Sequence, residues 1–504
     1  MSSFLKKNHS TYTGFQMLGL LLGPSLFFLT LFVLPLEGLE GPGRAALASA
    51  LWVAVWWVSE AIPIEATGLL PMVLLPLSGA LELGAISSSY GHKLVMLYLA
   101  GFLIAIAIER GNLHRRIALN IIYALGTNPS RLVLGFMVAT GLLSMWISNT
   151  ATSLMMLPIG MAVVKQLSDK EADAAMSTPF AKALMLGIAY AASIGGTATL
   201  IGTPPNLIFA AVVEDLFGIE ITFVQWFSFG LPFSVIMMSI CWWVLTKGIF
   251  GLTTKAIPEG KVVIKQQLKA LGPISASEAW VLVIFSLTAL AWISRSFLSK
   301  DLQLQLGIDD TVIGLMGASL LFMLPAPGEK GQRLLSWKDT QKLPWGILLL
   351  FGGGLALATG FKQTDLAAWM GDQLNLLMGL ALIVVLLAVT AMINFLTEIT
   401  SNLATASMII PIVAALAISL GWHPYALMVP AILAASCAFM LPVATPPNAV
   451  AFGSGYLRMG DMIRSGVWLN LLSILLIVIW VYLYLPWIWD LDLQAVPAEF
   501  QLSR

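Results

Sequence analysis

Long apolar segments recur along almost the whole chain, and they constrain its fold more than any other feature. Only 10% of the 504 residues are charged and 58% are hydrophobic, whereas soluble domains carry about 25% charged residues. Apolar helices of roughly 17–25 residues cross the hydrocarbon core of a bilayer and satisfy their own backbone hydrogen bonds there. We therefore expect an all-α polytopic membrane protein. The predicted spans are residues 14–36, 43–59, 63–80, 94–108, 180–216, 226–247, 277–297, 311–327, 345–361, 424–455 and 467–488.

The loops alternate in charge, which predicts their orientation. Lysine and arginine concentrate in cytoplasmic loops. Eleven crossings with a cytoplasmic N-terminus and an outside C-terminus place the basic loops on one side. The basic residues are Lys6, Lys7, Arg110, Arg115, Arg116, Lys247, Lys255, Lys261, Lys265, Lys269, Lys330, Arg333, Lys338, Lys342, Arg458 and Arg464. The opposite loops carry Glu37, Glu40, Glu214, Asp215, Asp365, Asp372, Asp490 and Asp492.

Two apolar regions, 131–165 and 376–420, do not fit as single crossings, because each is interrupted by a polar motif. If either region is counted as a span, the basic loops no longer all fall on the same side of the membrane. We interpret them as re-entrant hairpins whose tips lie at membrane depth. Irregular backbone is tolerated there only inside protein or beside a water-filled cavity, so the hairpin tips are candidate binding sites.

The chain also repeats itself. Residues 148–152 (SNTAT) return as 401–405 (SNLAT), an offset of 401 − 148 = 253, and residues 202–206 (GTPPN) return as 444–448 (ATPPN), an offset of 448 − 206 = 242. The loop 109–116 is basic and its counterpart 362–369 is nearly neutral, which predicts two inverted repeats with a site between them. The predicted divisions are 1–42 (tail and first helix), 43–247 (first repeat), 248–276 (cytoplasmic linker), 277–488 (second repeat) and 489–504 (tail).

Each SN motif precedes an apolar helical run and so lies at a half-helix N-terminus. Free backbone N–H groups and the positive end of the helix dipole bind carboxylates or other oxyanions there without an arginine. The Asn149 and Asn402 amides and the Thr150 hydroxyl can donate to such an anion, whereas Leu403 cannot.

The Thr-Pro-Pro-Asn segments predict a second break in each half, because proline starts a helix but interrupts its interior. Carbonyls exposed there, with the side chains of Ser144, Ser148 and Thr397, form a neutral set of oxygens. Hard cations prefer oxygen ligands, which makes sodium the natural candidate. Glu398 is the one acid beside an SN motif, either as a hydrogen-bonded structural acid or as a proton-coupling group.

Four segments resemble the divalent anion/sodium symporter family, which includes sodium-coupled dicarboxylate, citrate and sulfate carriers. They are residues 60–63 (EAIP) with Thr67, Leu69, Leu70 and Pro71; residues 109–116 (ERGNLHRR); the two SN motifs; and residues 436–448 (SCAFMLPVATPPN). The resemblance implies eleven helices with two re-entrant hairpins, a homodimer, and an elevator mechanism in which a transport domain slides against a scaffold.

The resemblance also implies roles for residues at matching positions. One sodium site would use Ser144, Ser148, Asn149 and the loop containing Gly195, Gly196 and Gly202, and the other would use Thr397, Thr400, Asn402 and Ala444. The substrate would meet Asn149, Thr150, Ser401, Asn402, Thr445 and Pro446. Leu403 departs from the threonine that many dicarboxylate carriers hold, and we expect it to put an apolar wall beside one substrate carboxylate.

The expected function is sodium-coupled import of a C4-dicarboxylate or a related di- or tricarboxylate across a bacterial inner membrane. A sodium-independent exchanger, or a citrate- or sulfate-selective carrier, is the alternative. An intramembrane enzyme is disfavoured because the polar breaks hold no nucleophile–base pair. The zero net charge indicates no nucleic-acid partner.

Overall fold

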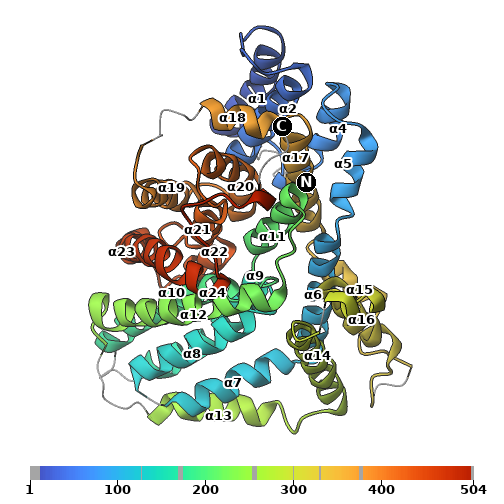
Figure 1. Cartoon of the computed structure of the whole chain (residues 1–504). Helices are drawn as coiled ribbons and strands as arrows, with labels where there is room; N and C mark the ends of the chain where they lie inside the picture. The colour runs from blue at the N-terminus through green and yellow to red at the C-terminus, as the bar shows by residue number, and fades with distance from the viewer. Residues whose placement is uncertain are drawn as a thin grey trace, which may run out of the picture.

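The structure is a computed structural model that describes residues 12–126, 128–168, 174–252, 258–298, 300–328, 331–373 and 379–500. These residues are almost entirely helical (Figure 1). Seven of their helical segments are long and apolar enough to cross a membrane: Gly14–Phe32, Leu83–Arg110, Phe223–Ile249, Ala276–Arg295, Trp345–Gln363, Asn402–Ser419 and Met459–Trp489. The predictions that concern Lys6, Lys7, Lys255, Lys330 and residues 501–504 lie outside the described residues.

The helices fall into two series. The first comprises α1 (Gly14–Phe32), α2 (Gly41–Ser59), α3 (Ile64–Thr67), α4 (Leu70–Leu77), α5 (Leu83–Tyr90), α6 (Lys93–Arg110), α7 (Leu113–Leu125), α8 (Pro129–Ser144), α9 (Asn149–Ser168), α10 (Ala174–Gly196), α11 (Pro204–Phe217) and α12 (Phe223–Trp243), which continues as a π-helical segment to Ile249. The second comprises α13 (Pro258–Ala270), α14 (Ala276–Arg295), α15 (Lys300–Leu306), α16 (Asp310–Met323), α17 (Trp345–Gln363), α18 (Leu366–Gln373), α19 (Leu382–Leu396), α20 (Asn402–Ser419), α21 (Tyr425–Ser436), α22 (Pro446–Gly453), α23 (Met459–Ile479) and α24 (Leu485–Trp489).

Helix boundaries in the two halves follow the offset seen in the sequence. Helices α6 and α17 end at Arg110 and Gln363, so 363 − 110 = 253. Between α6 and α7, and between α17 and α18, the turn contains a left-handed residue, Asn112 (φ 55°) or Asp365 (φ 54°). Asn and Asp are the residues other than glycine that adopt this conformation most readily. The two halves therefore share an order of helices as well as short motifs.

The segments 109–116 and 362–369, interpreted as loops from the sequence, are only in part loops. In each, a short turn leads directly into a helix, α7 from Leu113 or α18 from Leu366. The same correction applies to the linker 248–276, which contains helix α13 with Val263 and Ile264 buried. Apolar side chains on one face of this helix pack against the protein, which a count of charges does not reveal.

The span predicted over 63–80 is helical from Ile64 to Leu77 but is interrupted. This segment forms two short helices, α3 and α4, with Gly68 between them. A Cβ atom at Gly68 would lie 2.9 Å from the Leu350 Cα atom, and one at Gly353 would clash with the Gly68 carbonyl. The interruption thus lies where α17 makes backbone-to-backbone contact with this segment. By contrast, the spans predicted over 180–216 and 424–455 are interrupted at their Thr-Pro-Pro segments, as expected.

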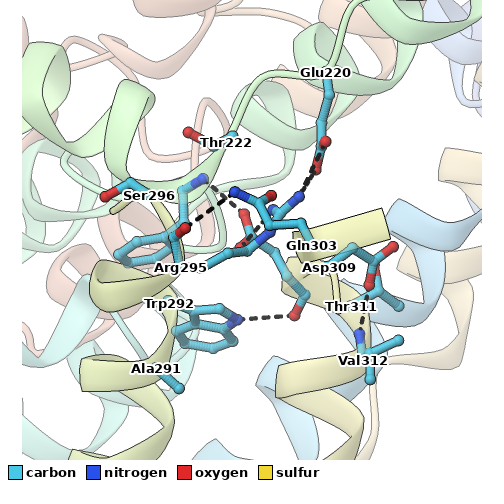
Figure 2. Close-up of polar contacts among 12 residues, drawn as sticks. Glu220, Thr222, Ala291, Trp292, Arg295, Ser296, Gln303, Asp309, Thr311 and Val312 are labelled. Atoms are coloured by element: carbon cyan, nitrogen blue, oxygen red, sulfur yellow. Dashed lines mark hydrogen bonds and ion pairs between the residues drawn. The ribbon is translucent and has the colours of Figure 1, made fainter. Parts of the chain in front are cut away.

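An ion cluster, in which Arg295 and Asp310 are buried and Glu220 is exposed, connects the start of α12 to α14 and α16. Arg295 lies 2.9 Å from Asp310 Oδ1 and 2.9 Å from Glu220 Oε1, and Figure 2 shows the guanidinium between these elements. The Phe223 backbone N–H donates to Asp310 Oδ2 over 2.8 Å, and the Trp292 indole donates to the Asp310 carbonyl over 2.8 Å. The cluster fixes the turn that connects α11 to α12 against two neighbouring helices.

Candidate functional site: two equivalent polar breaks

The first polar break combines a hairpin tip with an interrupted helix. Helix α8 ends at Ser144 and α9 begins at Asn149, so the helical path is broken at residues 145–148, where the sequence predicts a hairpin tip. The Ser144 hydroxyl donates a hydrogen bond to Asn149 Oδ1, which orients the amide. The Ser148 hydroxyl accepts from the Ala151 backbone N–H over 3.2 Å and caps α9.

The glycines predicted for this site lie against the hairpin tip. A Cβ atom at Gly196 would lie 2.8 Å from Asn149 Oδ1 and 3.0 Å from the Gly202 carbonyl oxygen. One at Gly195 would clash with the backbone of Gly141 in α8. Small residues are therefore required here by close approach, and Asn149, Gly196 and Gly202 form one cluster. Helix α10 stops at Gly196, and α11 begins at Pro204 after an irregular segment.

The second break repeats this arrangement. The Thr397 hydroxyl lies 2.7 Å from Asn402 Oδ1, and it also lies 3.0 Å from the Ala435 carbonyl. Thr397 and Asn402 are the counterparts of Ser144 and Asn149 at the offset of 253 (397 − 144 = 402 − 149). Helix α21 ends at Ser436 and α22 begins at Pro446. The same hydroxyl-to-amide contact thus orients the asparagine of each SN motif.

The remaining predicted residues of the second break differ in their surroundings. Thr400 bonds to the Leu396 carbonyl over 2.9 Å and to the Thr405 hydroxyl over 2.7 Å. Ala444 is buried, and the Thr445 hydroxyl accepts from the Asn448 backbone N–H over 3.3 Å, which caps α22. Pro446, at the next position, is exposed. Backbone and side-chain oxygens therefore line both sides of this break.

Helix packing connects the two halves. Helix α9 of the first hairpin packs against α22, and the equivalent helix α20 packs against α11 (Figure 1). Each hairpin helix therefore lies beside the half-helix that follows the break of the other half. This packing places Asn149 and Thr150 on a helix next to the one that begins at Pro446.

Exposure differs among the residues predicted to meet a substrate. Asn149, Thr150, Ser401 and Asn402 are each partly exposed, at or immediately before the first turn of their helices. Leu403 is only 5% exposed, so most of its side chain is taken up by packing within the protein. The accessible polar edge of the two helix starts thus consists of neutral donors and acceptors.

This chemistry suits an anion and a hard cation together. The first residues of α9 and α20 offer backbone N–H groups and the positive end of a helix dipole, which stabilise a carboxylate. The Asn Oδ1 atoms and the carbonyls of the irregular segments offer the oxygens that hard cations prefer. Each break can therefore hold charges of both signs within a short distance of one another.

Glu398 lies behind the second break and is 3% exposed. Its carboxylate accepts hydrogen bonds from the backbone N–H groups of Phe439 (2.7 Å), Met440 (2.9 Å) and Leu441 (3.0 Å), and from the Asn470 amide (2.7 Å). These contacts join the tip of the second hairpin to the irregular segment 437–445. They correspond to the structural alternative stated above, an acid satisfied by neighbouring backbone.

Two buried asparagines, Asn206 and Asn448, were recognised from the sequence as parts of a motif but given no role in the site. Each lies near the start of its half-helix, and its amide donates to carbonyls of the preceding irregular segment. Their recurrence at the offset of 242 was a usable signal. What the sequence lacked was the direction in which the side chains point.

Comparisons with known proteins agree with the predicted family. The family model for the sodium:sulfate symporter transmembrane region matches residues 17–491. The chain is 45% identical over 499 residues to the sodium-dependent dicarboxylate transporter SdcS of Staphylococcus saprophyticus, covering 98% of this chain and 96% of the relative. SdcS of Staphylococcus aureus strain USA300 is also 45% identical, over 498 residues, with the same coverage.

Two solved structures share the fold. Neisseria gonorrhoeae MtrF, described as an antimetabolite efflux pump, has a TM-score of 0.56 at 13% identity and covers 92% of this chain and 98% of its own. The Alcanivorax borkumensis YdaH transporter has a TM-score of 0.54 at 14% identity, with 89% and 99% covered. Because the family model spans nearly all the helices described above, the chain belongs to the sodium:sulfate symporter transmembrane family, the divalent anion/sodium symporters that its motifs predicted.

Proposed function

We propose that this protein is a secondary active transporter that couples sodium entry to the uptake of a C4-dicarboxylate such as succinate, malate or fumarate. The observation that carries the proposal is the pair of equivalent polar breaks. Each combines a half-helix N-terminus for an anion with neutral oxygens for a cation, and no lysine or arginine lies nearby in sequence. Relatives that are 45% identical over nearly the full chain are named sodium-dependent dicarboxylate transporters.

The ligand assignment follows the expectations from sequence. The first sodium site comprises Ser144, Ser148, Asn149 and the segment from Gly195 to Gly202. The second comprises Thr397, Thr400, Asn402 and Ala444. The close approach of Gly196 to Asn149, and the contact between Thr397 and Asn402, support these groupings.

The substrate lies between the half-helix starts, at Asn149, Thr150, Ser401, Asn402, Thr445 and Pro446, with Leu403 as an apolar neighbour. Bound sodium compensates the substrate charge, because an unpaired charge at membrane depth is costly. The packing of α9 against α22 supports a site shared by both halves.

The transport cycle is an elevator motion in a homodimer, with eleven crossings, two re-entrant hairpins and inverted repeats. The protein resides in a bacterial inner membrane with its N-terminus in the cytoplasm and its C-terminus outside. The matching helix boundaries of the two halves support the repeat. The match to a family model for a symporter transmembrane region supports the proposed location in a membrane.

Uptake of radiolabelled succinate into proteoliposomes tests the proposal. An inward sodium gradient should drive uptake that unlabelled dicarboxylates block, with citrate and sulfate as weaker competitors. Asn149→Ala should abolish this uptake, whereas Asn120→Ala, at an exposed asparagine whose amide donates to the Arg116 carbonyl of its own helix, should not. Uptake that is independent of sodium but requires internal carboxylate would indicate an exchanger and would contradict the assignment of the two sodium sites.

A further inference from the structure

In both halves an asparagine side-chain amide donates hydrogen bonds to backbone carbonyls of the irregular segment that precedes its helix. We call this set of contacts the clamp. The Asn206 amide nitrogen lies 3.4 Å from the Gly196 carbonyl, 3.3 Å from that of Thr197 and 2.8 Å from that of Thr199. The Asn448 amide nitrogen lies 3.2 Å from the Ala438 carbonyl and 3.0 Å from that of Leu441.

The acceptors correspond between the halves, since 438 − 196 and 441 − 199 both equal 242, the offset of the asparagines themselves. The surrounding side chains do not correspond so closely, because Thr199 becomes Leu441 and Gly196 becomes Ala438. The contact is made with the backbone, so it persists although the side chains change. It is therefore a property of the loop geometry that both halves share.

The hydrogen bonds that the N–H2 group of each asparagine donates to the carbonyls determine the orientation of the amide. Asn206 and Asn448 are fully buried, and the Oδ1 atom of each is buried without a hydrogen-bond partner in the described part of the chain. A buried acceptor without a partner is unfavourable. Turning either amide over would aim Oδ1 at carbonyl oxygens and would leave those carbonyls unsatisfied as well. The bonds to the loop therefore outweigh the unsatisfied Oδ1 in both halves.

The clamp determines which oxygens of the irregular segment remain free. Outside a helix, carbonyls lose their regular i+4 partners and can point in several directions. The asparagine amide donates hydrogen bonds to two or three carbonyls of the segment. The same segment approaches the hairpin tip at Gly196, where a Cβ atom would lie 2.8 Å from Asn149 Oδ1. A displacement of the clamped carbonyls would thus alter the spacing between Asn149 and the segment.

We propose that Asn206 and Asn448 are positioning residues for the two cation sites. Each holds its irregular segment at a fixed spacing from the hairpin asparagine. The inference rests on the proposed function, since it requires that sodium binds at these breaks. It adds that selection among alkali cations depends on two buried amides that face away from the ion.

The test uses Asn206→Leu and Asn448→Leu, which remove the amide donors but keep the branching of the side chain at Cγ. Thr390→Val is the control, because Thr390 is equally buried and its hydroxyl donates to the Leu386 carbonyl of its own helix over 2.6 Å. The melting temperature of each full-length purified protein is measured without substrate during titration with sodium, lithium or potassium chloride. Sodium activation of succinate uptake is measured in parallel.

Each Leu variant should require at least tenfold more sodium for half-maximal stabilisation, and its preference for sodium over lithium should fall. The control should keep the wild-type midpoint and preference. A purely structural role would lower the melting temperature at every salt concentration but leave the ratio of sodium to lithium midpoints unchanged, and that result would overturn the inference.

If the Leu variants do not fold, Asn206→Ser and Asn448→Ser test the inference by the same ratio of sodium to lithium midpoints. Serine keeps a hydroxyl but cannot reach several carbonyls at once. The two proposals fail differently. A wild-type protein that neither binds sodium nor uses it for uptake contradicts the proposed function and this inference with it. A sodium-dependent wild type with unaltered variants contradicts only the inference.

Discussion

Gly196→Ala should weaken sodium activation of transport without unfolding the protein. The added methyl group would lie 2.8 Å from Asn149 Oδ1 and 3.0 Å from the Gly202 carbonyl, whereas ordinary contacts begin at 3.4 Å. Asn149 Oδ1 must therefore move away from the methyl group by 3.4 − 2.8 = 0.6 Å, and the Gly202 carbonyl oxygen by 3.4 − 3.0 = 0.4 Å. Binding geometries generally tolerate displacements of only about 0.5 Å.

We expect at least a tenfold rise in the sodium concentration for half-maximal uptake, which corresponds to about 1.4 kcal/mol. Backbone strain does not contribute, because Gly196 is not among the glycines with positive φ. A loss of sodium affinity would therefore arise from the crowded site.

The assay is a sodium titration of succinate uptake in proteoliposomes, together with the melting temperature of the purified protein. Gly360→Ala is a matched control, because it adds a methyl group inside α17 at 3.7 Å or more from its nearest neighbours. The reasoning is refuted if a folded Gly196→Ala protein keeps the wild-type sodium dependence.

Three further outcomes are expected. Glu398→Gln should destabilise the protein by about 2 kcal/mol, because the amide N–H2 group would replace one carboxylate oxygen and face at least the Leu441 backbone N–H, which now donates to Oε2; unchanged stability with a lost response of uptake to a proton gradient would instead favour proton coupling. Leu403→Thr should improve uptake of short dicarboxylates relative to citrate, and an unchanged competition profile would contradict the role given to Leu403. Arg295→Met should lower stability by about 3–5 kcal/mol, because it leaves Asp310 buried without its partner at 2.9 Å. Restoration of the melting temperature by a second change, Asp310→Asn, would support this explanation, and a single variant as stable as wild type would contradict it.

The membrane class and the breaks at the repeated motifs could be predicted from sequence because each depends on local pattern. Apolar length identifies spanning helices, and Pro-Pro in a repeated motif interrupts a helix wherever it occurs. The positions of the SN motifs at helix starts followed from the same local rules, and α9 and α20 do begin at Asn149 and Asn402.

The division of 63–80 into two helices could not be predicted in this way. It lies where Gly68 and Gly353 make close backbone contact, and these residues are far apart in the chain. The helix within the linker 248–276 was missed for a related reason, since its buried face packs against segments that composition alone does not identify.

Sequence by itself determined which residues can supply oxygens and N–H groups, because chemical type and helix position are local properties. Tertiary structure decided how those groups are directed. The Glu398 carboxylate turns to the backbone of residues 439–441, and the Asn206 and Asn448 amides turn to the carbonyls behind each break. Hydrogen bonds need donor and acceptor within about 3 Å in a suitable direction. That condition is met only once helices distant in sequence have packed together.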